Sequence, residues 1–182
     1  MKKVIVMSCS IRKGRKTHKV AEFLCRELSK KEGLKVFMQD LEEVNLPMFT
    51  QRILEPKAAA RFKKFQDEIV AADGIIVVCP EYKNSIPGVL KNAWDYLKPQ
   101  VFNRIPMANI TLGSNSFGGP NCLSTLRLVE LAMGGLPTPQ KCYLNINEIF
   151  DEKGNLKESV TAENTAYVLD NYMWYLNRLS NN

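Results

Sequence analysis

The chain has 182 residues, of which 45% are hydrophobic and 24% are charged, and its formal net charge at pH 7 is +6. This length and apolar content are typical of one globular domain that buries its core without disulfides or structural metals. No apolar run reaches the roughly 18 residues of a membrane helix, and the first residues lead into a strand rather than a signal peptide. We therefore expect a single domain over residues 1–182 and no membrane partner.

The cysteines and the charge narrow the class of protein further. The five cysteines are scattered and include no C-x-x-C pair, which favours reduced thiols in a cytoplasmic protein and gives no sign of a zinc site. The positive charge favours anionic ligands, although a basic surface that is simply solvated has the same composition. Because no nucleic-acid-reading motif is recognisable, we expect no nucleic-acid partner.

Short apolar runs alternate with amphipathic helical patterns along the chain. The predicted strands are residues 4–7, 35–38, 75–79, 108–113 and 142–146. The predicted helices space apolar residues three and four positions apart, and their apolar faces carry, in chain order, Val20, Leu24 and Leu28; Ala58, Phe62, Phe65, Ile69 and Ala72; Leu90, Ala93 and Leu97; Cys122, Leu126, Val129 and Met133; and Ala162, Ala166, Leu169, Met173 and Leu176. Residues 40–56 form an irregular segment that is too apolar for a free linker, so we expect it to fold over the domain.

The alternation of five strands with five helices predicts an α/β fold with a parallel sheet and helices on both faces. The first, third and fourth predicted strands are the most apolar and should be central, which gives the strand order 2-1-3-4-5. In that order the chain reverses direction between strands one and three, where ligands bind at the carboxyl ends of the strands. Residues 8–17, 80–87 and 114–119 would line this crevice, and they are rich in Ser, Asn, Gly, Arg and Lys.

The first of these loops, residues 8–17, has the composition of a phosphate site. Ser10 and Thr17 offer hydroxyl groups, Arg12 offers a guanidinium, and the following helix offers free N–H groups at its start. Four closely spaced cations would repel one another without an anion: Arg12, Lys13, Arg15 and Lys16. The loop has neither a Walker ending nor the GxGxxG spacing, so it fits one phosphate better than a pyrophosphate. A solvated basic turn is the alternative interpretation.

The other residues indicate a bound cofactor rather than a catalytic apparatus made by the protein. Gly118 and Gly119 would let a flat ring approach the third loop, although a plain strand-to-helix turn has the same sequence. His18 is the only histidine and is expected on the surface, so no Ser-His-Asp or Cys-His device is available. Cys9 and Cys79 are expected to pack in the core. One phosphate and one flat ring match flavin mononucleotide (FMN), a cofactor that carries the reaction itself.

The sequence PEYKNSIPGVLKNA at residues 80–93 resembles the signature of the NAD(P)H-dependent FMN reductase family. Members of this family are flavodoxin-like proteins that include quinone, azo-dye and chromate reductases. Ser10, Arg12 and Gly14 resemble the phosphate loop of the same family. The similarity extends over residues 3–135.

The resemblance implies a flavodoxin-like domain that binds FMN and takes electrons from NADPH or NADH. The acceptor would be a small molecule such as a quinone, an azo compound or free flavin, and the assembly would be a homodimer or homotetramer. The phosphate would bind Ser10, Arg12 and Thr17, and the ring would meet the backbone of residues 80–82. The candidate cofactor-binding residues are Ser10, Arg12, Arg15, Thr17, Pro80, Glu81, Tyr82, Lys83, Ser85, Ser114, Asn115, Ser116 and Gly118. No catalytic side chain and no metal ligand are expected.

The candidate loops depart from the family pattern at several positions. Cys9 stands where glycine is usual, Arg15 where serine is common, Thr17 where asparagine is common and Lys83 where asparagine is usual. Cys9 would crowd the phosphate turn, and Lys83 would place a cation near the flavin and raise its potential. The alternative function is a non-enzymatic FMN-binding electron carrier or a redox-regulated interaction protein. Flavodoxin carriers are usually acidic, whereas this chain is basic.

Overall fold

The computed structural model describes residues 1–51, 53–114 and 119–179. Its strands are β1 (Lys2–Ser8), β2 (Leu34–Asp40), β3 (Gly74–Pro80), β4 (Pro106–Gly113), β5 (Leu136–Pro137) and β6 (Cys142–Asn145). Its helices are α1 (Lys16–Ser29), α2 (Leu41–Val44), α3 (Pro56–Val70), α4 (Gly88–Asp95), α5 (Pro120–Ala132), α6 (Ile146–Ile149) and α7 (Glu158–Leu179). Within this part of the chain, no helix combines the length and the apolar composition that a membrane span requires.

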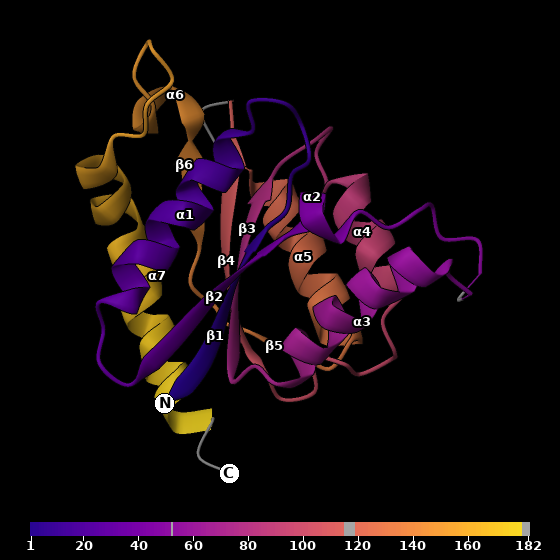
Figure 1. Ribbon diagram of the computed structural model, residues 1–182. Helices are drawn as coiled ribbons and strands as arrows, with labels where there is room; N and C mark the ends of the chain where they lie inside the picture. The colour runs from indigo at the N-terminus through magenta and orange to yellow at the C-terminus, as the bar shows by residue number, and fades with distance from the viewer. Residues whose placement is uncertain (52, 115–118, 180–182) are drawn as a thin grey trace.

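The strands form one parallel sheet in the order β2-β1-β3-β4-β5, which confirms the predicted order (Figure 1). The edge beside β4 differs from the prediction because two short strands share it. Pro106 and Met107 at the start of β4 pair with β5, whereas the end of β4 pairs with β6. The predicted fifth strand corresponds to β6. The two-residue strand β5 was not predicted, since it is too short for a pattern and ends on Pro137, which has no N–H for a ladder.

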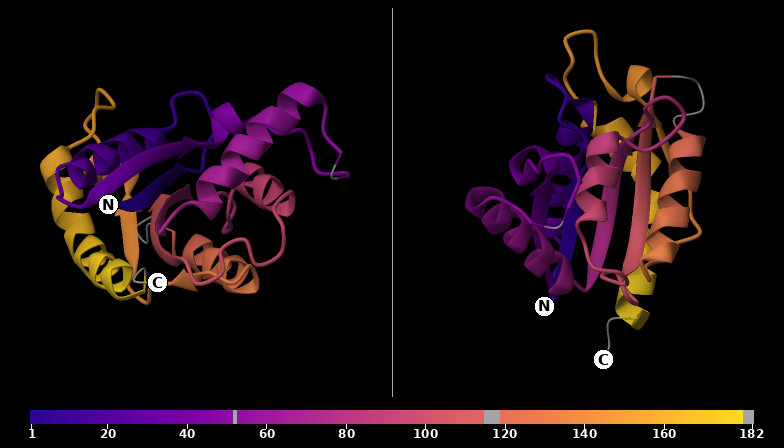
Figure 2. Two further views of the ribbon diagram at one scale, coloured as in Figure 1. Left: turned by 60° about the horizontal axis from the view of Figure 1, so that its bottom comes forward. Right: turned by 90° about the vertical axis from the view of Figure 1, so that its right-hand side faces the viewer.

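Two helical layers cover the two faces of the sheet, as predicted. Helices α1 and α7 pack on one face, and α3, α4 and α5 pack on the other (Figures 1 and 2). Successive residues of β1 alternate between the two cores: Val4 and Val6 face α1 and α7, whereas Ile5 and Met7 face the other layer. Burial on both faces explains why β1 and β3 carry continuous apolar runs rather than alternating ones.

The segment between α2 and α3 lies against α4, as the sequence predicted. The Asn92 side chain accepts a hydrogen bond from the Phe49 amide at 2.7 Å and donates one to the Pro47 carbonyl at 2.8 Å. The Phe49 and Tyr96 rings meet edge to face with centroids 4.9 Å apart. The start of the same region is not irregular, however, because Asp40 caps the short helix α2 by accepting a hydrogen bond from the Glu42 amide.

Candidate cofactor site

A pocket of about 270 Å³ lies at the carboxyl ends of the central strands. Its walls come from the loops after β1, β3 and β4, and from α6. The lining residues are Arg12, Lys13, Gly14, Arg15, Lys16, Thr17, Pro80, Glu81, Tyr82, Leu112, Gly113, Ser114 and Ile146. The structure therefore brings the predicted loops together, because the carboxyl ends of parallel strands meet at one edge of the sheet.

The first and second loops are joined directly by two side-chain contacts. The hydroxyl oxygens of Ser10 and Tyr82 lie 2.7 Å apart in a hydrogen bond. The guanidinium carbon of Arg12 lies 5.3 Å from the centre of the Tyr82 ring, in a cation–π contact. Ser10 itself is fully buried and also accepts a hydrogen bond from the Arg12 amide at 3.4 Å. These contacts bring two hydroxyl groups and one cation together at one side of the pocket.

Helix α1 begins at the pocket with backbone donors that no side chain caps. Its N-cap residue, Arg15, makes no side-chain capping bond, and its first turn carries no acidic residue. The first N–H groups of a helix have no partner within the helix, and they favour an anion there together with the helix dipole. Thr17 lies in this first turn, is only 3% exposed and lines the pocket. The predicted phosphate loop thus has the physical features of an anion site.

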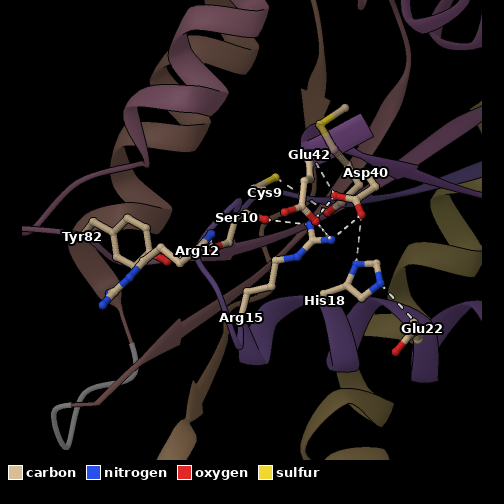
Figure 3. A network of polar contacts seen from close by, with 10 residues as sticks. Cys9, Ser10, Arg12, Arg15, His18, Glu22, Asp40, Glu42 and Tyr82 are labelled. Carbon is tan, nitrogen blue, oxygen red and sulfur yellow. Dashed lines mark hydrogen bonds and ion pairs between the residues drawn. The ribbon is translucent and has the colours of Figure 1, made fainter. Parts of the chain in front are cut away.

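Arg15 belongs to an ion-pair network that the sequence did not predict (Figure 3). Its guanidinium donates to both carboxylate oxygens of Asp40 and to Glu42 at 2.6 Å. It also donates to the Ser10 carbonyl at 2.8 Å. Burial opposes ionisation of Asp40, but the hydrogen bonds from Arg15 and the Glu42 amide and the charge of Arg15 hold the Asp40 pKa below its ordinary value.

His18 was expected on the surface, but its side chain lies against the same network. It is 21% exposed, and its Nδ1 atom is 3.3 Å from the Asp40 carboxylate. The prediction missed this contact because Asp40 is 22 residues after His18 in the sequence. The two side chains meet because Asp40 ends β2, which pairs with β1 in the sheet. The only sequence signal for Asp40 is a carboxylate that directly follows a strand.

The second loop is a tight turn whose conformation is unusual. Tyr82 and Ser85 exchange backbone hydrogen bonds of 3.0 and 3.1 Å. Lys83 and Asn84 between them have positive φ angles of 50° and 59°, as a type I′ turn requires. Lys83 and Ser85 lie beside the pocket and are not among its lining residues.

Glu81 connects the second loop to the start of α5. Its carboxylate accepts a hydrogen bond from the Cys122 amide at 2.9 Å, and its own amide donates to the Leu112 carbonyl at 2.7 Å. Gly119, the N-cap of α5, has a φ angle of +107°, and a Cβ atom there would lie 3.3 Å from Glu81. Glu81 therefore holds the second and third loops together rather than extending freely into the pocket.

The third loop is described only at its ends. Ser114 lines the pocket, and its carbonyl accepts a hydrogen bond from the Asn147 side chain at 3.2 Å. The predicted cofactor-binding residues Asn115, Ser116 and Gly118 lie outside the described residues. Ile146 at the start of α6 also lines the pocket and was missed, because nothing in its local sequence distinguishes it from a strand residue.

Three buried thiols lie in the core beneath the pocket. Cys9 and Cys79 belong to the same hydrophobic cluster, which confirms the prediction that they pack in the core. Cys122 joins them, with its sulfur 3.5 Å from that of Cys79. Burial raises the pKa of the Cys79 thiol well above its ordinary value. A buried thiol that keeps its proton is a poor nucleophile, so Cys79 is suited to packing rather than to nucleophilic chemistry.

The family of the chain follows from a comparison with known sequences. Residues 2–151 match the family described as NADPH-dependent FMN reductase. The chain belongs to this FMN reductase family. The predicted family is therefore confirmed, and with it the prediction of an FMN-dependent oxidoreductase.

Curated FMN reductase relatives resemble the chain over most of its length. A quinone reductase of Pseudomonas putida is 29% identical over 171 residues, which cover 91% of this chain and 90% of that protein. An NADPH azoreductase of a Bacillus species is 30% identical over 175 residues, which cover 91% of this chain and 92% of that protein. The flavoenzyme FerB of Paracoccus denitrificans, an NAD(P)H:(acceptor) oxidoreductase, has the same fold, with a TM-score of 0.74 at 23% identity over 98% of this chain and 99% of that one.

The described residues of the pocket fit FMN on physical grounds. The Arg12 guanidinium and the uncapped start of α1 together provide charged and neutral donors for one phosphate, and the buried Ser10 hydroxyl lies behind this part of the wall. The rest of the wall includes Pro80, Leu112 and Ile146 beside the polar residues Glu81, Tyr82 and Ser114, and such a mixture of apolar and polar groups suits a flat aromatic ring.

Proposed function

We propose that this protein uses NADPH or NADH to reduce a small conjugated acceptor, such as a quinone, an azo compound or free flavin, through bound FMN. The observation that carries the proposal is that, in a chain of the FMN reductase family, residues 12–17 of the predicted phosphate loop line one pocket with residues 80–82, the start of the signature. Bound FMN would supply the two-electron chemistry, accepting the equivalent of a hydride and then releasing electrons to the acceptor. The quinone and azo classes are suggested by the names of the relatives.

The protein's own residues bind and orient the cofactor in this proposal. Ser10, Arg12 and the first N–H groups of α1 bind the phosphate. The backbone of residues 80–82 would contact the flavin ring. The proposed contacts from the rest of the loops are Thr17, Lys83, Ser85, Ser114, Asn115, Ser116 and Gly118.

Glu81 acts in this proposal as a structural connection and not as a proton donor. Its carboxylate is already engaged by the Cys122 amide, which fixes the distance between the second loop and the start of α5. A pocket held at constant width positions a flat ring without any movement of the protein during the reaction.

We also propose that residues 1–182 form a single domain and that the protein assembles as a homodimer or homotetramer. Although Pro47 and Phe49 bond to Asn92 of α4, the segment between α2 and α3 projects beyond the body of the molecule (Figure 2). It carries the exposed apolar side chains of Met48 and Ile53, which are 77% and 78% exposed. Exposed apolar groups of this kind support an interface with another subunit. The five free cysteines support a cytoplasmic location, where thiols remain reduced.

The proposal is tested by the spectrum and the kinetics of the purified protein. We expect flavin absorbance in the visible range, which bleaches when NADPH or NADH is added without oxygen. With a quinone as acceptor, double-reciprocal plots should be parallel, because donor and acceptor would use the same face of the site in turn. A protein that neither binds FMN nor oxidises either nucleotide in its presence contradicts the proposal.

A further inference from the structure

We propose that Arg15 positions the phosphate loop through Asp40 and does not itself bind the phosphate. This inference rests on the proposed function, because it concerns how the loop holds FMN. It differs from the direct contact that the basic sequence of the loop predicts for Arg15. A positioning role and a direct phosphate contact can be told apart because Asp40, the partner of Arg15, carries a negative charge that a substitution can remove.

The hydrogen bonds of Arg15 account for all of its terminal donors. Nη1 donates to Asp40 Oδ1 and to the Ser10 carbonyl, and Nη2 donates to Asp40 Oδ2 and to Glu42 Oε2. The two terminal nitrogens of a guanidinium carry four N–H groups. Each of these groups therefore has an acceptor within the protein, and none of them is left for a phosphate oxygen.

Asp40 is a fixed anchor for this guanidinium. Its side chain is only 5% exposed, and it also accepts a hydrogen bond from the Glu42 amide at 3.0 Å. Asp40 lies opposite Ser8 in the parallel pairing of β2 with β1. The bidentate contact thus ties the loop after β1 to the end of the neighbouring strand, with the planar geometry that arginine and carboxylate share.

Arg15 connects the two ends of the phosphate loop through this anchor. It is the N-cap residue of α1, and it donates to the carbonyl of Ser10 at the beginning of the loop. Its contacts therefore fix the Ser10 hydroxyl relative to the first N–H groups of α1. Arg12 is placed differently, since its guanidinium is stacked on Tyr82 within the pocket wall, and Arg12 supplies the cation for the phosphate.

The two roles of Arg15 predict opposite effects for Asp40→Asn. If Arg15 bound the phosphate directly, loss of a carboxylate beside the anion site would reduce repulsion and free the guanidinium, so FMN would bind as tightly as before or more tightly. If Arg15 is a positioning residue, the same change loosens the loop and weakens binding although a negative charge is removed. The asparagine oxygen can still accept from the Glu42 amide, so the cap of α2 is retained.

The first measurement is the dissociation constant of FMN and of riboflavin, which lacks the phosphate, from the quenching of their fluorescence. We expect Asp40→Asn to weaken FMN binding by about tenfold, as expected for the loss of charge-assisted contacts that order the loop, and to leave riboflavin binding unchanged. The charge-matched control is Glu42→Gln, because the Glu42 side chain is 58% exposed and such pairs contribute little. It should change FMN binding by less than about twofold. Unchanged or tighter FMN binding by Asp40→Asn overturns the proposal, as does an equal loss of riboflavin binding.

Arg15→Lys gives a second test should Asp40→Asn fold poorly, as judged from thermal melting. Lysine keeps the positive charge but cannot make the bidentate contact with Asp40. A positioning role predicts the same selective loss of FMN binding. Retention of wild-type FMN affinity by Arg15→Lys indicates that the charge alone is needed and overturns the proposal.

Limited digestion with trypsin tests the loop in the FMN-free protein. Arg12, Lys13 and Lys16 are cleavage sites within the loop, and Asp40→Asn leaves them all in place. We expect faster cleavage in this loop for Asp40→Asn than for wild type or Glu42→Gln. Equal rates overturn the positioning role even if FMN binds, whereas failure of the wild-type protein to bind FMN contradicts only the proposed function.

Discussion

The conformation of Lys83 is a residue-scale feature that departs from ordinary sequence preference. Lys83 and Asn84 both have positive φ angles in the turn between Tyr82 and Ser85. Asparagine tolerates this region because its short side chain bonds to the local backbone, whereas lysine gains nothing there. In this turn beside the pocket, the positive φ angle is therefore favourable for Asn84 and unfavourable for Lys83.

We predict that Lys83→Asn stabilises the protein by about 0.5–1 kcal/mol, because it relieves the left-handed strain at this position. Urea unfolding at pH 7 measures the change. Asn84→Ala in the same turn serves as the opposite control and should destabilise the protein. A lower unfolding midpoint for Lys83→Asn would show that the lysine side chain contributes more than its backbone conformation costs.

Glu130 is a second residue whose environment makes a measurable prediction. It is fully buried in α5, and burial raises the pKa of its carboxyl to about 7, although the hydrogen bond from Asn109 and the charge of Arg127 act in the opposite direction. The folded protein therefore binds this proton more tightly than the unfolded chain does. This contribution to stability is complete below pH 4.5 and is lost as the pH rises through 7.

We predict that Glu130→Gln becomes more stable than wild type as the pH rises from 5 to 8, by up to about 3 kcal/mol. The glutamine oxygen can still accept the Asn109 hydrogen bond, which is 2.8 Å long in the native protein, but it carries no charge to bury. Urea unfolding at both pH values measures the difference. The exposed Glu152→Gln removes the same charge and should show no such dependence. Parallel pH profiles for wild type and Glu130→Gln would contradict the assigned role.

The junction between the second loop and α5 is the feature of interest at the scale of elements. Glu81 accepts a hydrogen bond from the Cys122 amide in the first turn of α5, so a residue of the loop after β3 caps a helix by bonding to a residue 41 positions later in the sequence. This contact requires a close approach at Gly119, where a Cβ atom would lie 3.2 Å from Thr111 and 3.3 Å from Glu81. The width of the pocket therefore depends on a glycine.

We predict that Gly119→Ala destabilises the protein by about 1–3 kcal/mol and weakens FMN binding, because it adds both backbone strain and a steric contact. Gly154→Ala is a matched control. Gly154 also has a positive φ angle, of +77°, but a Cβ atom there would meet no atom within 4 Å. Thermal unfolding and FMN titration of the two variants separate the effect of backbone strain, which both variants share, from the effect of the steric contact, which only Gly119→Ala introduces. Equal effects of both variants on FMN binding would contradict the claim that the contact between Gly119 and Glu81 shapes the pocket.

At the scale of the whole molecule, much of the fold could be predicted because the central strands are buried on both faces. β1 and β3 carry unbroken apolar runs, and β4 is apolar except at Asn109 and Thr111, so both the existence and the central position of these strands follow from hydrophobicity. The short elements β5, α2 and α6 could not be predicted, since two to four residues carry no periodicity. Their positions are set by contacts with distant parts of the chain.

The residues of the candidate site were predictable only where their role depends on the local sequence. Ser10, Arg12 and Thr17 could be predicted because hydroxyl and guanidinium side chains closely follow the end of a strand. The structure places Arg12 and Thr17 in the pocket wall, with Ser10 behind them. The role of Arg15 was not predictable, because it depends on Asp40, which is 25 positions away and belongs to the neighbouring strand. Local composition identifies donors, but it does not reveal which donors are already occupied.

The most direct test of the account is a comparison of FMN and riboflavin binding by the purified, cofactor-free wild-type protein. The two ligands share the ring, so the difference in their dissociation constants isolates the phosphate. We predict that FMN binds about 100-fold more tightly than riboflavin, as several charge-assisted hydrogen bonds at the start of α1 require. Equal affinities, or no measurable binding of either ligand, would contradict the claim that this pocket binds FMN through its phosphate.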